Sequence, residues 1–147
     1  MDKKIIIGIG VIALILFAIF VVKPKNNTTN SLNPTGATKV QVFLFHATQR
    51  CPTCIRIGKL AEATIEERFA EQIKSGKIEF REINIDLPEN KTLAEKFQAT
   101  GSALYINSIK NGQDNIVEDT MVWQLASGHE IKFKDYLSSK LNTILEI

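Results

Sequence analysis

The chain has 147 residues, of which 44% are hydrophobic and 23% are charged, a composition typical of a globular domain with an apolar core. Residues 1–25 carry four lysines and one aspartate, which leaves 14 basic and 15 acidic residues elsewhere, a near-neutral balance that excludes the basic surface required for nucleic-acid binding. Two cysteines allow at most one disulfide or dithiol, so a fold that depends on a disulfide framework is also excluded.

The first 25 residues predict a membrane anchor. Between flanking lysines, Ile5 to Val22 form a run of 18 uncharged and mostly aliphatic residues. A helix of that length spans about 27 Å, close to the thickness of the hydrocarbon core of a bilayer. A cleaved signal peptide would have a shorter apolar core and small residues before the cut, and a lipoprotein would have a cysteine just after the run. Neither pattern is present, so we expect an uncleaved single-pass transmembrane helix over residues 5–22.

The anchor also predicts where the other parts of the chain lie. A short basic N-terminus before a single apolar segment usually stays in the cytoplasm. We therefore expect a protein of the cell (inner) membrane whose C-terminal domain faces the periplasm or the cell exterior. Residues 26–38 are dense in Asn, Thr, Pro and Gly, which is typical of a flexible linker, and residues 39–147 form the domain.

The domain is predicted to begin with a strand, a helix and a second strand. Residues 40–45 are a β-branched and aromatic run, typical of a buried strand. Over residues 54–75, apolar side chains recur at steps of three and four, which predicts an amphipathic helix that stops at Ser75-Gly76. Alternating apolar residues within 77–86 predict the second strand. A strand, a crossover helix and a strand indicate a parallel pair.

The second half of the domain adds a helix, a hairpin and a closing helix. Residues 88–101 begin with Pro and end at Gly, which predicts a short helix. Residues 103–119 predict two strands around the turn Asn111-Gly112. The closing amphipathic helix is marked by Phe133, Leu137, Leu141, Ile144 and Leu145. The order β-α-β-α-β-β-α predicts an α/β fold of three layers, in which helices cover both faces of a mixed central sheet.

The two cysteines form a C-x-x-C motif where the first predicted strand meets the first predicted helix. Cys51 takes the expected N-cap position, and Pro52 takes the first helical position. Free backbone N–H groups and the positive end of the helix dipole favour a sulfur anion there, and Arg50 adds a cation close by. Cys54, which follows Thr53 one turn into the helix, lies on the same helix face and can close a disulfide with Cys51. We therefore predict that Cys51 attacks a partner and that Cys54 resolves the mixed disulfide.

Two other interpretations of the motif compete with a redox dithiol. A structural disulfide across two intervening residues would close a very short loop and so would stabilise little. A zinc site commonly takes four ligands, and only His46 and His129 could complete the set. His46 ends a predicted strand and His129 lies in a predicted surface loop, so each has an ordinary structural explanation. We favour the redox dithiol over the structural disulfide and the metal site.

The motif and its surroundings resemble the thioredoxin superfamily. CPTC follows the first strand and opens the long helix, and residues 81–104 are similar to the stretch that thioredoxins use between the second helix and the active-site-facing loop. More narrowly, HATQRCPTCIRIGKLAE, TGSALYIN and Trp123 together resemble the ArsF family, anchored thioredoxin-like proteins of bacterial arsenic-resistance gene clusters that carry the label nitrophenyl compound nitroreductase subunit. The resemblance covers residues 39–147. It implies a thioredoxin-like fold in which Cys51 is the exposed nucleophile and Cys54 the buried resolving cysteine.

The chain departs from the thioredoxin pattern at two places. Thioredoxins carry a buried Asp near the end of the first strand, which handles the proton of the resolving cysteine, and the corresponding position here is Phe45. Thioredoxins also place a cis-proline opposite the dithiol, where this chain has Thr-Gly-Ser-Ala at residues 100–103. Ser102 and Ala103 therefore stand where the resemblance expects the loop that shapes the substrate groove.

The resemblance also implies partners. Such proteins accompany membrane electron carriers similar to those of cytochrome c maturation, and a dithiol outside the cell needs that supply of electrons. We therefore expect an extracytoplasmic thiol–disulfide oxidoreductase, a reductive shuttle between such a carrier and a disulfide-bearing client protein or small thiol-reactive substrate. The Cys51–Cys54 pair would act without a further cofactor.

Two alternative functions follow from the ArsF resemblance. In the first, the thiolates of Cys51 and Cys54 bind a soft ion such as trivalent arsenic, because soft ions prefer sulfur ligands. In the second, the chain is an electron-transfer subunit of a nitroreductase system. Reduction of a nitro group by the chain itself would need a flavin or a similar cofactor, and the sequence has no flavin or dinucleotide fingerprint.

Overall fold

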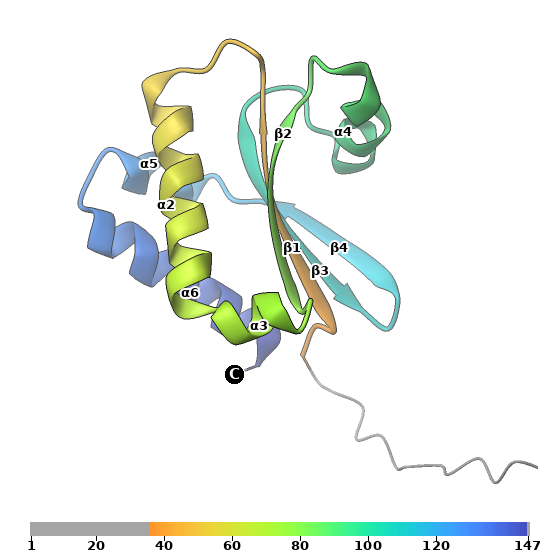
Figure 1. Cartoon of the computed structure of the whole chain (residues 1–147), viewed down its shortest axis with the longest axis vertical. Coiled ribbons are helices and arrows are strands. Elements are labelled where there is room, and N and C mark those ends of the chain that lie inside the picture. The colour runs from red at the N-terminus through yellow and green to blue at the C-terminus, as the bar shows by residue number, and fades with distance from the viewer. Residues whose placement is uncertain (1–35, 147) are drawn as a thin grey trace, which may run out of the picture. The chain divides into compact units, whose positions relative to one another are not determined.

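The computed structural model describes residues 36–146 (Figure 1). The predicted anchor at residues 1–25 and the predicted linker up to residue 35 lie outside the described residues. Across the described part of the chain, no helix combines the length and the apolar character that crossing a membrane requires.

Within residues 36–146, four strands form one mixed sheet. They are β1 (Lys39–His46), β2 (Ile78–Asn84), β3 (Ala103–Lys110) and β4 (Gln113–Glu118), in the spatial order β2-β1-β3-β4. β1 runs parallel to β2 and antiparallel to β3, and β3 runs antiparallel to β4. The parallel pair, the hairpin and the mixed sheet predicted from the sequence are thus confirmed.

The long helix after β1 is divided into two. The structure has α2 (Pro52–Arg68) and α3 (Ala70–Lys74), where the sequence predicted one helix over 54–75. The backbone leaves the helical region at Phe69, with φ −133° and ψ 28°, and the Phe69 ring is buried in the core. Burial of this ring at the helix end outweighs the continuation that the apolar spacing predicts.

The second predicted helix is shorter than expected. A 3-10 turn (Pro88–Asn90) leads into α4 (Lys91–Phe97), and α4 ends at Gln98, which has a φ of 55°. The prediction placed the stop at Gly101, because glycine is the usual residue for a left-handed helix end. Gln98 takes this conformation instead, and its backbone N–H donates to the carbonyl groups of Ala94 and Glu95.

Two helices follow the hairpin, one of which the sequence did not predict. α6 (Glu130–Leu145) confirms the closing helix. The unpredicted helix is α5 (Met121–Ala126), a segment of six residues that buries Val122 and Ala126. Six residues are fewer than two helical turns, which is too short for an apolar repeat to show.

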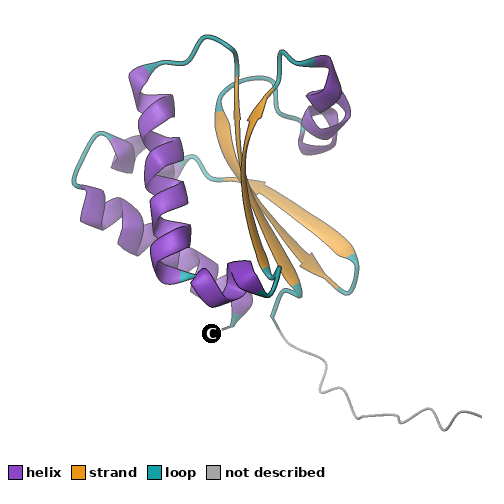
Figure 2. Cartoon of the chain, viewed as in Figure 1, coloured by secondary structure: helices purple, strands orange, loops and turns teal. Residues whose placement is uncertain are grey.

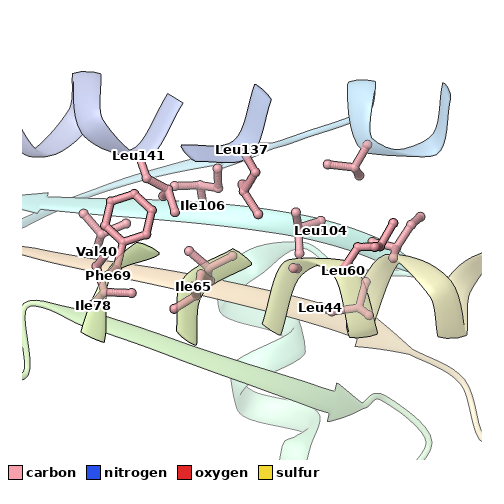
Figure 3. Close-up of a cluster of buried hydrophobic side chains, with 14 of the residues drawn as sticks. Val40, Leu44, Leu60, Ile65, Phe69, Ile78, Leu104, Ile106, Leu137 and Leu141 are labelled. Atoms are coloured by element: carbon pink, nitrogen blue, oxygen red, sulfur yellow. The ribbon is translucent and has the colours of Figure 1, made fainter. Parts of the chain in front are cut away.

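The helices cover both faces of the sheet, as predicted, but unequally. Figure 2 shows α2, α5 and α6 on one face and α4 on the other. The larger core lies under α2 and α6, where Leu44 and Leu104 from the sheet meet Leu60 and Leu137 (Figure 3). The smaller core lies under α4 and is mainly aromatic, formed by Phe43, Phe45, Phe97 and Tyr105. This order of elements and this sheet are those of a thioredoxin-like α/β fold.

Candidate redox site

The two cysteines lie at the junction of β1 and α2. β1 ends at His46, a short loop follows, and Cys51 is the N-cap of α2 with an extended backbone, φ −76° and ψ 156°. The residue before a proline is disfavoured from the helical region, so Pro52 at the first helical position holds Cys51 in the conformation that an N-cap takes. The predicted N-cap and proline positions are therefore confirmed.

The two thiols differ sharply in accessibility. Cys51 is exposed, whereas Cys54, one turn into α2, is buried with no exposed surface. Pro52 between them is exposed, and Thr53 is half-buried. An external sulfur can reach Cys51, but Cys54 can react only with a group already brought to it, such as a disulfide on Cys51. This asymmetry is the one that the resemblance implies.

The helix N-terminus provides a hydrogen bond to the exposed sulfur. The backbone N–H of Cys54 donates to Cys51 Sγ over 3.4 Å, and the N–H of Ile55 donates to the carbonyl of Cys51 over 3.1 Å. This donor and the positive end of the helix dipole both lie at the Cys51 sulfur. The thiolate is the form that attacks a disulfide.

Arg50 turns toward Glu82 and Cys54, a more specific placement than the sequence predicted. Its Nη1 donates to Glu82 Oε2 over 2.6 Å and its Nη2 to Oε1 over 3.2 Å, a bidentate ion pair. Nη2 also lies 3.4 Å from the carbonyl oxygen of Cys54. We predicted this cation close to Cys51, but the contacts that the structure gives it are with Glu82 and with the carbonyl oxygen of Cys54.

Glu82 is a site residue that the sequence analysis did not identify. It lies on β2, where Ile78 and Phe80 pack into the core on the side of the sheet that α2 covers. Glu82 follows at the same alternate spacing, so it lies on the same face of the sheet. The register pairs Glu82 with Leu44 of β1. A charged residue in an apolar alternation is the signal that could have marked it, because such a charge needs a partner.

Phe45, expected in place of a buried acid, lies on the other face of the sheet from α2. Its ring is 5.3 Å from that of Phe97 and 5.5 Å from that of Tyr105, within the core under α4. Side chains alternate along a strand, so the neighbouring Leu44 is the β1 residue that faces α2. The acid near the cysteines on the α2 side of the sheet is therefore Glu82 of β2.

The loop before β3 reaches the same end of the sheet as the dithiol (Figure 1). Ala103 is buried and pairs with Phe45 near the end of β1, and Ser102 is half-buried just before it. Between residues 36 and 146 no peptide bond is cis. Ser102 and Ala103 thus lie where the resemblance expects the groove-shaping loop, without the cis-proline of that loop.

The predicted alternative ligands have other surroundings. His46 Nδ1 lies 2.9 Å from the carbonyl oxygen of Ala47, and His129 is exposed at the N-cap of α6. No three His, Cys, Asp or Glu side chains of the described residues gather into a group that could hold a metal ion. Within this part of the chain, the two cysteines have no third side-chain ligand beside them.

Comparison with known proteins finds similarity at the level of solved structures. No family model matches the chain. No curated protein matches it either. A thioredoxin from Fasciola hepatica is 22% identical, with 70% of this chain and 82% of that one covered and a TM-score of 0.42. A thioredoxin from Malassezia sympodialis is 27% identical, with 69% and 80% covered and a TM-score of 0.41.

A third solved structure is an uncharacterised thioredoxin-like protein from Clostridium perfringens. It is 14% identical, with 84% of this chain and 90% of that one covered, and its TM-score is 0.47. The thioredoxin-like fold therefore rests on the strand order and on the position of the helices described above. The narrower ArsF resemblance stays a prediction.

Proposed function

We propose that this chain is a thiol–disulfide oxidoreductase that uses Cys51 as its nucleophile and Cys54 as its resolving cysteine. The observation that carries the proposal is the pairing of an exposed sulfur at a helix N-cap with a buried sulfur one turn later. The exposed sulfur accepts a backbone hydrogen bond, and the buried one is protected from reaction with anything but its neighbour.

The reaction takes place in two exchanges. The Cys51 thiolate attacks a client disulfide, so that a mixed disulfide forms and one client thiolate leaves. The Cys54 thiolate then attacks Cys51 Sγ, and the second client thiolate leaves as the Cys51–Cys54 disulfide forms. The client gains two electrons, which come from the two cysteines. A membrane electron carrier would return the pair to the dithiol.

We further propose that the protein works as an extracytoplasmic reductive shuttle of the inner membrane. The support for this comes from the sequence: an apolar run at residues 5–22, a short basic N-terminus before it, and a polar linker after it. A dithiol outside the cytoplasm needs reducing equivalents from across the membrane, because the glutathione pool does not maintain it there. The ArsF resemblance favours a carrier similar to those of cytochrome c maturation as the donor.

Trapping of mixed disulfides tests the proposed roles. A Cys54→Ser chain keeps the nucleophile but lacks the group that resolves, so we expect it to accumulate covalent adducts with client proteins in cells. The matched Cys51→Ser chain should form none, because Cys54 is buried. Adducts are measured as bands on non-reducing gels that disappear on reduction. Equal trapping by the two variants and the wild type would contradict the proposed function.

A further inference from the structure

The buried cysteine lacks the acid that the thioredoxin pattern places beneath it. Cys54 has no exposed surface, and removing its proton in an apolar environment is unfavourable unless a nearby charge stabilises the anion. On β1, Leu44 faces α2 and Phe45 faces α4. A charge that stabilises the anion of Cys54 therefore comes from outside β1.

The guanidinium of Arg50 is a charged group in contact with the backbone of this cysteine. Its Nη2 lies 3.4 Å from the Cys54 carbonyl oxygen, and the arginine side chain is only 19% exposed. The hydrogen bond to Glu82, opposed by burial and reinforced by the side chain of Cys54, holds the pKa of Arg50 above its ordinary value. A permanent cation, paired with Glu82, thus lies beside the backbone of Cys54.

One donor of this guanidinium has no acceptor in the dithiol form. Within the described residues, Arg50 Nε is buried and has no hydrogen-bond partner. A buried donor left unsatisfied is unfavourable, so a negative charge or acceptor that forms close to it stabilises the site. A thiolate that forms at Cys54 would bring a negative charge close to this guanidinium, whose Nη2 already contacts the Cys54 carbonyl oxygen.

Glu82 holds Arg50 in this position. Both carboxylate oxygens accept hydrogen bonds from the two terminal guanidinium nitrogens, which fixes the plane of the arginine. The carboxylate approaches α2 at Gly58, one turn after Cys54 on the same helix face, where a side chain would overlap it. Glu82 therefore acts through Arg50, as a positioning residue.

We propose that Arg50, held by Glu82, stabilises the thiolate of Cys54 and thereby speeds the step in which Cys54 resolves the mixed disulfide. This inference rests on the proposed thiol–disulfide exchange. In the step, Cys54 releases its proton to solvent, its sulfur bonds to Cys51 Sγ, and the bond from Cys51 to the client sulfur breaks. The client sulfur leaves with the electron pair and takes a proton from solvent, so protons and electrons balance.

Water has a route to this guanidinium. A groove of about 410 Å³ runs between α2 and β2, and Arg50, Ile55, Lys59 and Glu82 are among its lining residues. A proton released beside Arg50 can reach solvent along this groove. The charged and titratable groups that line this groove with Arg50, on β2 and α2, are Glu82, Arg81, Lys59 and Glu62.

Stopped-flow reaction with an aromatic disulfide separates the two exchanges. The full chain, reduced and purified in detergent, should release one coloured aryl thiolate when Cys51 attacks and a second when Cys54 resolves. In Arg50→Gln we expect the first phase to stay within about twofold of the wild type and the second to slow about tenfold or more, because the cation beside the thiolate is lost. Arg50→Lys keeps the charge but not the planar guanidinium with its paired donors, so the rate of its second phase should lie between those of the wild type and Arg50→Gln.

Matched variants and pH separate this role from a structural one. Arg56→Gln removes an arginine of α2 whose Nη2 donates to the Gly128 carbonyl oxygen, and it should leave both phases unchanged. Glu82→Gln should slow only the second phase, and should add nothing to Arg50→Gln if Glu82 acts through the arginine. The deficit in Arg50→Gln should shrink at strongly alkaline pH, where thiols in general are deprotonated without a neighbouring cation.

The outcomes distinguish the inference from the function on which it rests. A normal first phase with equal second phases in the wild type and in Arg50→Gln would overturn the inference alone. A wild-type chain that releases no aryl thiolate through Cys51 would contradict the proposed function as well. Thermal unfolding shows whether Arg50→Gln folds, and Glu82→Gln, which preserves the size of the side chain, carries the test if it does not.

Discussion

Gly58 shows how closely the residues around the dithiol depend on one another. A Cβ at this position would overlap the Glu82 carboxylate and would lie 3.0 Å from Leu44 Cδ2. A glycine inside a helix is less favourable than alanine by about 1 kcal/mol, so its presence in α2 calls for a physical reason. The close approach of Glu82, which keeps Arg50 against Cys54, supplies that reason.

Replacing this glycine should destabilise the fold. We expect Gly58→Ala to lower the free energy of unfolding by about 1–2 kcal/mol, because overpacking outweighs the gain in helix propensity. Urea unfolding followed by circular dichroism measures the change. Gly101→Ala is the control, since no heavy atom lies within 4 Å of a Cβ added there, and its effect should be small. A Gly58→Ala chain as stable as the wild type would show that Glu82 can move without loss.

Sequence reasoning identified the cysteines but not the ion pair beside them. Cys51 and Cys54 carry a local signal, because their spacing, the proline between them and the start of an apolar repeat all lie within a few residues. Arg50 and Glu82 are 32 positions apart, and they meet only because β1 and β2 pair in one particular parallel register. A shift of one residue would turn Glu82 to the other face of the sheet.

Among the elements, the junction between β4 and α5 contains a buried charge of its own. Asp119 is 2% exposed and accepts hydrogen bonds from Tyr136 Oη and Lys140 Nζ, both over 2.9 Å, and from the N–H of Met121 over 3.2 Å. The network joins the unpredicted α5 to α6. Burial opposes the charge of Lys140, but the contact with Asp119 outweighs burial and raises the pKa of Lys140.

Removal of the lysine should reveal what this junction contributes. We expect Lys140→Met to lower the free energy of unfolding by about 1–3 kcal/mol at neutral pH, because Asp119 stays buried without its counter-charge while the lysine itself is partly screened. Because the pKa of Lys140 is raised in the folded state, this stabilisation is full below about pH 10 and is lost as pH rises further. The difference between variant and wild type should therefore shrink at strongly alkaline pH.

Urea unfolding at neutral pH and at strongly alkaline pH checks the prediction for Lys140→Met. The control is Lys132→Met, which removes an exposed lysine of the same helix. If the two variants are equally stable at neutral pH, the buried pair does not stabilise the junction.

The sequence could predict α6 from its apolar repeat but not its contact with Asp119, because that contact depends on where the six-residue α5 places the chain. The break at Phe69 was missed for a related reason, since the periodicity continues across it.

At the scale of the whole domain, the sequence predicted the strands of the sheet better than the helices that cover it. Each strand has a local signal, either an apolar run or an alternation, and Asn111-Gly112 marks the hairpin. How the two faces are covered is a property of the assembled fold: α2, α5 and α6 lie on one face and the short α4 on the other (Figure 2). The dithiol lies where these layers end, so its exposed and buried sulfurs are a consequence of the fold as well as of the motif.

The steady-state oxidation of Cys51 and Cys54 in intact cells tests the proposed reductive shuttle most directly. Acid quenching followed by alkylation with a mass-tagged reagent counts the free thiols in the full chain, and Cys51→Ser and Cys54→Ser mark the mobility of the singly tagged species. We predict that most molecules carry two free thiols, because a membrane carrier keeps the pair reduced. A pair found mostly as the disulfide would contradict the reductive shuttle.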